Sequence, residues 1–131
     1  MRGIYVLAIQ LRKNIDVKVG ALGQIEFASG LYLYVGSAQN NLEMRVKRHL
    51  SREKRKFWHI DYLLGNEEAV ITKVFYKEST KTEECQIATQ ISQKGTGIEK
   101  FGCSDCKCKS HLYRVDNEEF LYNKMRLLKA L

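Results

Sequence analysis

Three apolar runs rich in β-branched and aromatic residues constrain the fold of this chain more than any other feature. Their length and composition predict three main strands: GIYVLAIQL at 3–11, LYLYVG at 31–36 and AVITKVFYK at 69–77. The segment 16–30, between the first two, holds three glycines and short alternating pieces. It predicts an inserted hairpin or extended loop, with weak strands near 17–19 and 24–27.

The other segments carry helical patterns or turn residues. Residues 41–53 are expected to be helical because one face carries apolar residues at i, i+4 and i+8, namely Leu42, Val46 and Leu50. Asn40 or Asn41 can cap this helix. Further elements are expected as helices at 57–65, 81–93 and 117–131, a short strand at 111–115, and a loop at 94–110 with a cysteine-rich part at 102–111.

The chain is long enough to bury one core. It has 131 residues, of which 44% are apolar and 28% charged, so we expect a single domain over 1–131. The order of strands and helices predicts an α+β fold in which helices pack on a sheet. We find no apolar run near the roughly 20 residues that a membrane-spanning helix needs and no signal peptide. We therefore expect a cytoplasmic protein whose four cysteines are reduced thiols or metal ligands.

Positive charge is concentrated in one segment. The net charge of the chain is +7, and residues 42–56 contribute +5 of it, with seven Lys or Arg against Glu43 and Glu53. On a helix, four basic positions form one stripe: Arg45, Arg48, His49 and Arg52. This stripe is either a solvated helix face or a phosphate-binding surface, for which arginine is well suited. Backbone N–H groups at the Gly36-Ser37 turn add to the potential for binding anions.

A carboxylate is the second chemical requirement of a site that cleaves phosphodiesters with a metal. In the expected helix 81–93, Glu84 continues the apolar stripe, whereas its neighbour Glu83 aligns with polar residues. Glu84 is thus either a carboxylate at a buried helix edge, which needs a cation or a partner, or an exposed residue near the helix N-terminus. Asp61 and Glu43 are weaker alternatives.

Two tripeptides and two later residues resemble a known family. GIY at 3–5 and YVG at 34–36 are followed by Arg45, nine residues after Gly36, and by His49, four residues further on. This combination resembles the GIY-YIG endonuclease superfamily, over roughly residues 3–92.

The resemblance is to a branch of small stand-alone prokaryotic proteins that sometimes occur fused to a DNA-repair glycosylase. The stretches WHIDYLL (58–64) and SDCKCKSHL (104–112) look typical of that branch. The resemblance implies a small three-stranded antiparallel sheet flanked by helices, to which the hairpin at 16–30 is added.

The resemblance also implies an activity. It is metal-dependent hydrolysis of DNA phosphodiester bonds, with Mg²⁺ or Mn²⁺, in DNA repair or recombination. The alternative is a nucleic-acid-binding module that keeps the fold without cleaving, and a zinc-stabilised adaptor for a protein partner is a third possibility. The pattern leaves monomer and dimer open.

Family roles can be assigned to five residues. Tyr5 is implied as the general base toward water, Tyr34 lines the site, Arg45 binds the scissile phosphate, His49 assists proton transfer and Glu84 holds the cation. The other expected nucleic-acid contacts are Gly36, Ser37, Lys47, Arg48, Arg52, Lys54, Arg55 and Lys56.

The late part of the chain leaves two questions open. The family has a late asparagine, for which Asn123 is a candidate, unless Ser110 or His111 supplies the polar group. The motif C-x₂-C-x-C-x₂-H either forms a tetrahedral zinc site or holds thiols packed near the cleft. Its residues are Cys103, Cys106, Cys108 and His111.

Overall fold

The three predicted main strands form the centre of the sheet. The computed structural model describes residues 1–52, 55–102 and 108–130. Its strands are β1 (Gly3–Leu11), β2 (Ile15–Lys18), β3 (Gln24–Phe27), β4 (Gly30–Ala38), β5 (Ala69–Glu78), β6 (Gly95–Gly97), β7 (Leu112–Val115) and β8 (Arg126–Ala130). Its helices are α1 (Leu42–Leu50), α2 (His59–Leu64) and α3 (Glu83–Ser92), with 3₁₀ turns η1 (Gly20–Leu22) and η2 (Glu119–Asn123).

The main sheet is larger than predicted. Within the described residues it has six strands in the order β6-β7-β4-β1-β5-β8, and neighbouring strands pair antiparallel. The predicted three-stranded sheet is therefore wrong in size, although its three strands are the central β4-β1-β5. The inserted hairpin is confirmed, because β2 and β3 form a separate two-stranded sheet.

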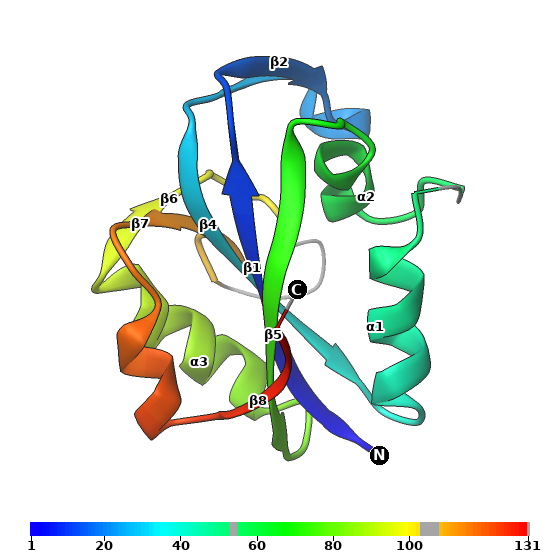
Figure 1. Cartoon of the computed structure of the whole chain (residues 1–131), viewed down its shortest axis with the longest axis vertical. Helices are drawn as coiled ribbons and strands as arrows, with labels where there is room; N and C mark the ends of the chain where they lie inside the picture. The colour runs from blue at the N-terminus through cyan, green and yellow to red at the C-terminus, as the bar shows by residue number, and fades with distance from the viewer. Residues whose placement is uncertain (53–54, 103–107, 131) are drawn as a thin grey trace.

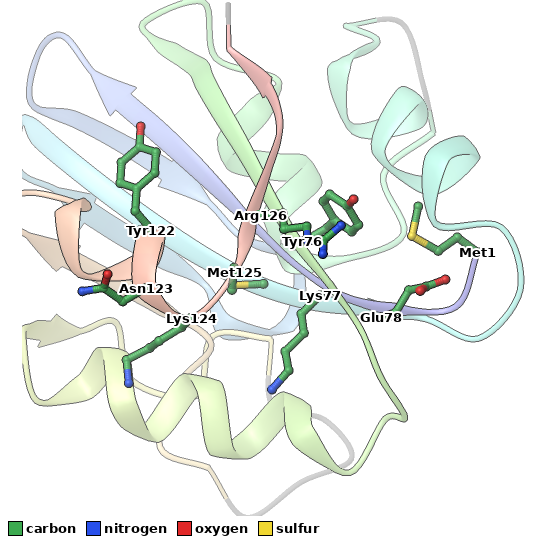
Figure 2. A pocket seen from close by; sticks show the side chains of 9 residues that line it. All are labelled: Met1, Tyr76, Lys77, Glu78, Tyr122, Asn123, Lys124, Met125 and Arg126. Atoms are coloured by element: carbon green, nitrogen blue, oxygen red, sulfur yellow. The ribbon is translucent and has the colours of Figure 1, made fainter.

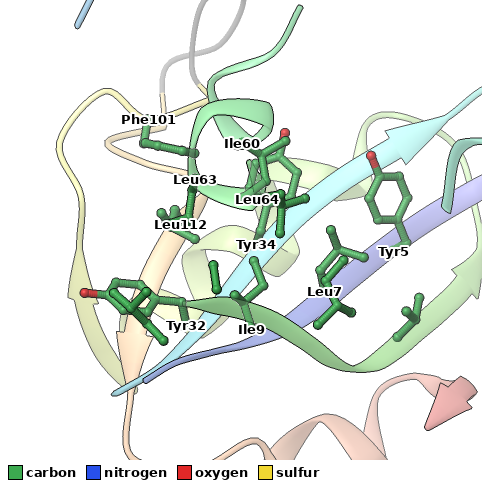
Figure 3. Packing of buried hydrophobic residues seen from close by; sticks show 14 of the residues in the cluster. Tyr5, Leu7, Ile9, Tyr32, Tyr34, Ile60, Leu63, Leu64, Phe101 and Leu112 are labelled. Carbon is green, nitrogen blue, oxygen red and sulfur yellow. The ribbon is translucent and has the colours of Figure 1, made fainter. Parts of the chain in front are cut away.

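Each face of the sheet has its own core. Residues of β1 alternate between the faces, so that Tyr5 and Leu7 point to one core while Ile4 and Val6 point to the other. The first core packs against α1 and α2, and the second against α3 and η2. Figure 1 shows α1 and α2 on one side of the sheet and α3 on the other. Figure 3 shows the first core.

The helices begin and end close to where the sequence predicted. The side chain of Asn41 accepts a hydrogen bond from the N–H of Met44 and caps α1. The backbone N–H of Gly65 bonds back to the carbonyl of Asp61 at the end of α2. The start of α3 follows Thr82, which makes no side-chain cap bond. No helix in the described ranges is long and apolar enough to cross a bilayer.

The predicted C-terminal helix at 117–131 is wrong. Its described residues form η2 and then β8, which pairs with β5 along Lys73–Tyr76. Acidic residues at the start of this segment and basic residues at its end favour a helix locally, but pairing with the edge of β5 overrides that weak preference. Leu121 and Met125 are buried in the second core and hold this segment in place. The predicted loop at 94–110 also contains the short strand β6.

Candidate active site

A small cavity lies at the edge of the sheet where β7 stops pairing with β4. β7 pairs with Leu31–Tyr34 of β4, and the cavity opens beside Gly36 and Ser37 further along the same strand. Its volume is about 200 Å³. Residues from both faces of the sheet line it, namely Tyr5, Tyr34, Gly36, Ser37, Arg45, Trp58, Lys81, Glu84, Cys85, Gly102 and His111.

Tyr5 and His49 form a buried pair at this cavity. The Tyr5 hydroxyl lies 2.7 Å from Nε2 of His49, and each residue is 2% exposed. His49 comes from α1 and lies behind Tyr5, against the ring of Trp58. Burial, offset in part by the nearby Arg45 guanidinium, raises the pKa of Tyr5. Tyr5 is therefore a neutral phenol at pH 7, whose hydroxyl can donate to His49 and accept from the cavity.

Gly36 makes room for the Tyr5 ring. The two residues are directly opposite each other on β4 and β1. A Cβ atom on Gly36 would lie 2.4 Å from Cζ of Tyr5, closer than any packing allows. The glycine of the YVG tripeptide thus sets the position of the tyrosine of the GIY tripeptide, a contact that fixes the ring beside the cavity.

Tyr34 is part of the wall of the cavity, on the side of the first core. It lies on the same face of the sheet as Tyr5, and Figure 3 shows both rings in the first core. Its ring packs edge-on against His49 and against Phe101. Burial and the neighbouring Tyr5 and Glu84 raise the pKa of Tyr34, so this residue also stays neutral. Tyr34 shapes the cavity and contributes a hydroxyl to the wall.

Arg45 supplies the positive charge of the cavity. It projects from α1, and its Nη1 donates a 2.9 Å hydrogen bond to the carbonyl of Ser37. Its guanidinium carbon lies 4.8 Å from the centre of the Trp58 ring. The guanidinium also lies beside the Tyr5 hydroxyl, and it has five N–H donors in all. The remaining donors can serve an anion in the cavity.

Glu84 reaches the cavity from the other face of the sheet. Its Oε1 accepts a hydrogen bond from the Ser37 hydroxyl, and its Oε2 lies 3.0 Å from Nδ1 of His111. Burial acts to raise the pKa of Glu84, but the hydrogen bonds from His111 and Ser37 outweigh it, so the pKa lies below its ordinary value. Glu84 is therefore ionised at neutral pH. Its position agrees with the first of the two alternatives that the sequence left open.

The donor set around Glu84 fits a hard divalent cation. Mg²⁺ binds proteins through one or two carboxylates and takes its other ligands from water and substrate phosphates. Glu84 lines the cavity, and each of its oxygens keeps a second lone pair beside the one that Ser37 or His111 uses. The alternatives Asp61 and Glu43 lie elsewhere. Asp61 accepts bonds from two backbone N–H groups at the start of α2, and Glu43 lies near the N-terminal amine.

Two arginines of the predicted basic stripe make internal contacts. Arg48 donates to both carboxylate oxygens of Asp61, at 3.1 Å each, and lies against Trp58. Arg52 donates to the carbonyls of Leu64, Asn66 and Ala69, from the end of α2 to the start of β5. Both guanidinium groups hold α1 against α2 and the following turn. Of the three arginines in the stripe, Arg45 lines the cavity, whereas Arg48 and Arg52 do not.

The other predicted DNA contacts lie on the surface near α1. Lys47, Arg55 and Lys56 are exposed, and the Lys56 ammonium lies over the Tyr62 ring. Lys54 lies outside the described residues. Sequence reasoning missed Lys81, which lines the cavity and a neighbouring hollow that also includes Arg45. Its position three residues before Glu84 was the available signal.

The late asparagine candidate lies in another part of the molecule. Asn123 lines a second hollow, of about 570 Å³, between β5 and the η2–β8 segment (Figure 2). Ser110 is buried and bonds to the backbone of Leu112. Of the three candidates, His111 is the one that lines the cavity.

The cysteine motif is described in part. Cys103 and Cys106 lie outside the described residues, whereas Cys108 and His111 are placed. Sequence reasoning missed Cys85, whose Sγ lies 4.0 Å from Nε2 of His111. His59 accepts a hydrogen bond at Nδ1 from the N–H of Gly102, which lines the cavity.

Comparison with known proteins gives a family. Neither the curated proteins nor the solved structures contain a match to the chain. A family model described as "Domain of unknown function DUF123" matches residues 4–130, which include the strands, helices and cavity described above. The chain therefore belongs to the DUF123 family.

Proposed function

We propose that this protein is a metal-dependent endonuclease that hydrolyses DNA phosphodiester bonds. The observation that carries the proposal is the meeting of Tyr5, Arg45 and Glu84 in one cavity, with His49 behind Tyr5. These residues come from β1, α1 and α3, on both faces of the sheet. Together they offer a proton path, a guanidinium and a carboxylate, which phosphodiester hydrolysis requires.

Arg45 is the proposed phosphate ligand. Its bond to the Ser37 carbonyl and its contact with Trp58 limit the orientations of the guanidinium. A fixed guanidinium stabilises the negative charge that develops on a phosphoryl oxygen better than a mobile one. Lys81, at the same cavity and the neighbouring hollow, adds a second positive charge on the path of the DNA backbone.

Tyr5 and His49 are the proposed proton path. Because burial raises the pKa of Tyr5, a free phenolate is a poor starting state for the reaction. The 2.7 Å contact allows a relay in which the Tyr5 oxygen accepts a proton from water while its own proton passes to Nε2 of His49. The relay requires the His49 tautomer with Nε2 unprotonated.

Glu84 is the residue that would hold the divalent cation. When bound there, Mg²⁺ or Mn²⁺ would supply positive charge to the phosphate and would acidify a water molecule. The hydrogen bonds from Ser37 and His111 keep the Glu84 carboxylate ionised and oriented toward the cavity. These two residues therefore act as positioning residues for the carboxylate.

The surface charge supports DNA as the substrate class. The net charge of the chain is +7, and Lys47, Arg55 and Lys56 are exposed near the cavity-forming helix α1. Such charges bind the phosphate backbone without reading sequence. A role in DNA repair or recombination, on branched or damaged DNA, follows from the family resemblance.

The test is cleavage of plasmid and branched DNA with Mg²⁺ or Mn²⁺. Wild type is compared with Arg45→Ala and Glu84→Gln, and with Glu83→Gln as a matched control. Glu83 is the neighbouring acid on α3 but pairs with Lys77 and Ser79 away from the cavity. We expect cleavage by wild type and Glu83→Gln and its loss in the other two. Cleavage by Glu84→Gln at the wild-type rate would refute the site.

A second candidate is a nucleic-acid-binding module without catalysis. The observation in its favour is that Tyr5 is nearly inaccessible and its pKa is raised, as in ordinary aromatic packing. Salt-dependent DNA binding with no cleavage under either metal would select this function. In that case Arg45→Ala weakens binding, and Glu84→Gln leaves it unchanged.

A further inference from the structure

Two thiols and an imidazole meet beside the cavity, which two of them, Cys85 and His111, line. The Sγ atoms of Cys85 and Cys108 and a ring nitrogen of His111 all lie within 4.8 Å of one another. They come from separate parts of the chain, with Cys85 in the first turns of α3 and the other two before β7. In a tetrahedral zinc site with Zn–S bonds of about 2.3 Å, ligand atoms are separated by about 3.8 Å. The three atoms therefore reach zinc geometry with small side-chain movements.

His111 is already oriented as a metal ligand. Its Nδ1 lies 3.0 Å from the Glu84 carboxylate, and its Nε2 faces the Cys85 sulfur at 4.0 Å. An Nδ1–H that donates to a carboxylate leaves the lone pair on Nε2, which is the arrangement found around zinc-bound histidines. The residue is 2% exposed. Its backbone is fixed by hydrogen bonds with Phe101 and Val35.

We propose that Cys85, Cys108 and His111 bind one Zn²⁺ ion. Thiolate and imidazole ligands favour zinc over Mg²⁺, so this site is distinct from the carboxylate site at Glu84 in both position and metal preference. It differs from the set that the sequence motif indicated, since Cys85 of α3 joins Cys108 and His111. The inference requires neither DNA binding nor cleavage.

Zinc bound by Cys85, Cys108 and His111 would also stabilise the fold. A zinc ion there would tie the segment before β7 to α3, two parts of the chain that are distant in sequence. Because His111 also contacts Glu84, the ion orients the carboxylate indirectly. Removal of the zinc is expected to lower the melting temperature, since an ion that binds the folded state alone stabilises it.

The experiment is a zinc measurement on the reduced full-length chain, after reconstitution with Zn²⁺ and removal of excess metal. Elemental analysis should give about one zinc per chain in wild type and in the matched control His59→Gln, whose histidine lies outside the cluster. Zinc should be lost in Cys85→Ser and in Cys108→Ser. Retention of zinc at the wild-type level in Cys85→Ser would overturn the proposal.

A second measurement avoids variants that fail to fold. Wild type is alkylated at its cysteines with and without prior chelation, and the modified peptides are quantified by mass spectrometry. Bound zinc should protect Cys85 and Cys108, and chelation should increase their labelling at least tenfold. Equal labelling in both states would overturn the proposal, as would isolation of these two residues as a disulfide. Re-addition of zinc should restore both protection and the melting temperature.

Discussion

The hydroxyl of Tyr5 lies 2.7 Å from Nε2 of His49, and both side chains are buried. This contact joins the first strand to the basic helix and gives a buried phenol a route to lose its proton. Burial raises the pKa of Tyr5, so the histidine is the partner that makes proton transfer feasible. The proposed chemistry depends on this pair.

Tyr5→Phe should abolish most cleavage and leave the fold intact. The phenyl ring still fills the space beside Gly36, but the hydrogen bond to His49 and the proton path are gone. We expect the cleavage rate at saturating DNA to fall about 100-fold or more. The control is Tyr32→Phe, since that hydroxyl donates to the Ala28 carbonyl instead. If both variants cleaved equally, Tyr5 would have no role in proton transfer.

Gly36→Ala should destabilise the protein and displace Tyr5. A Cβ at position 36 would meet the Tyr5 ring at 2.4 Å, and the ring has no open side because it is buried. Overpacking of this kind costs about 1–3 kcal/mol in the free energy of unfolding. Urea unfolding measures the loss. Gly65→Ala is the control, because its Cβ would have its closest contact at 3.3 Å, and a comparable loss there would contradict the explanation.

Lys47→Ala should weaken DNA binding alone, whereas Arg45→Ala should weaken binding and also lower the cleavage rate. Lys47 is exposed on α1 and is a proposed contact of the DNA backbone, so its loss should weaken binding and reduce the salt slope by about 1. The cleavage rate at saturating DNA should stay the same. Arg45 lines the cavity, so its loss should also lower that rate. Binding and single-turnover cleavage at several salt concentrations separate the two effects, and identical behaviour would place Arg45 outside the site.

Local patterns were sufficient to predict the centre of the fold. The strands at 3–11 and 69–77 appear as β1 and β5, since buried strands need continuous apolar runs and these are visible without an alignment. Asn41 caps α1 as its residue type indicated. The proposed site positions Tyr5, Tyr34, Arg45 and His49 lie on β1, β4 and α1, and the family resemblance, rather than a local pattern alone, identified them.

Contacts between segments that are distant in the sequence could not be predicted from local sequence patterns. The basic stripe predicted that Arg48 and Arg52 contact nucleic acid, but their acceptors lie 12 to 17 residues along the chain, between α2 and the start of β5. The strand β8 forms because the edge of β5 is available, which composition does not reveal. Cys85 approaches His111 because α3 packs beside β7, so no motif contains the pair.

Asp61→Asn should destabilise the protein in a pH-dependent manner. The carboxylate of Asp61 is buried and accepts bonds from Arg48 and from the N–H groups of Phe57 and Trp58. Burial acts to raise the pKa of Asp61, but these hydrogen bonds outweigh it and lower the pKa in the folded state. Removal of the charge leaves Arg48 without its carboxylate partner, which should cost about 3 kcal/mol at pH 7.

The pH dependence has a definite sign. The folded pKa of Asp61 lies below the unfolded value of about 3.9, so the stabilisation is fully present above about pH 4 and is lost as pH falls through the folded pKa. Wild type and Asp61→Asn should therefore differ most near neutral pH and converge under acid conditions. Urea unfolding from pH 7 downward measures this, with the exposed Asp16→Asn as a control that stays within about 0.5 kcal/mol of wild type. A wild-type–Asp61→Asn difference independent of pH down to about 2 would show that packing around Asp61, rather than its charge, holds α1 against α2.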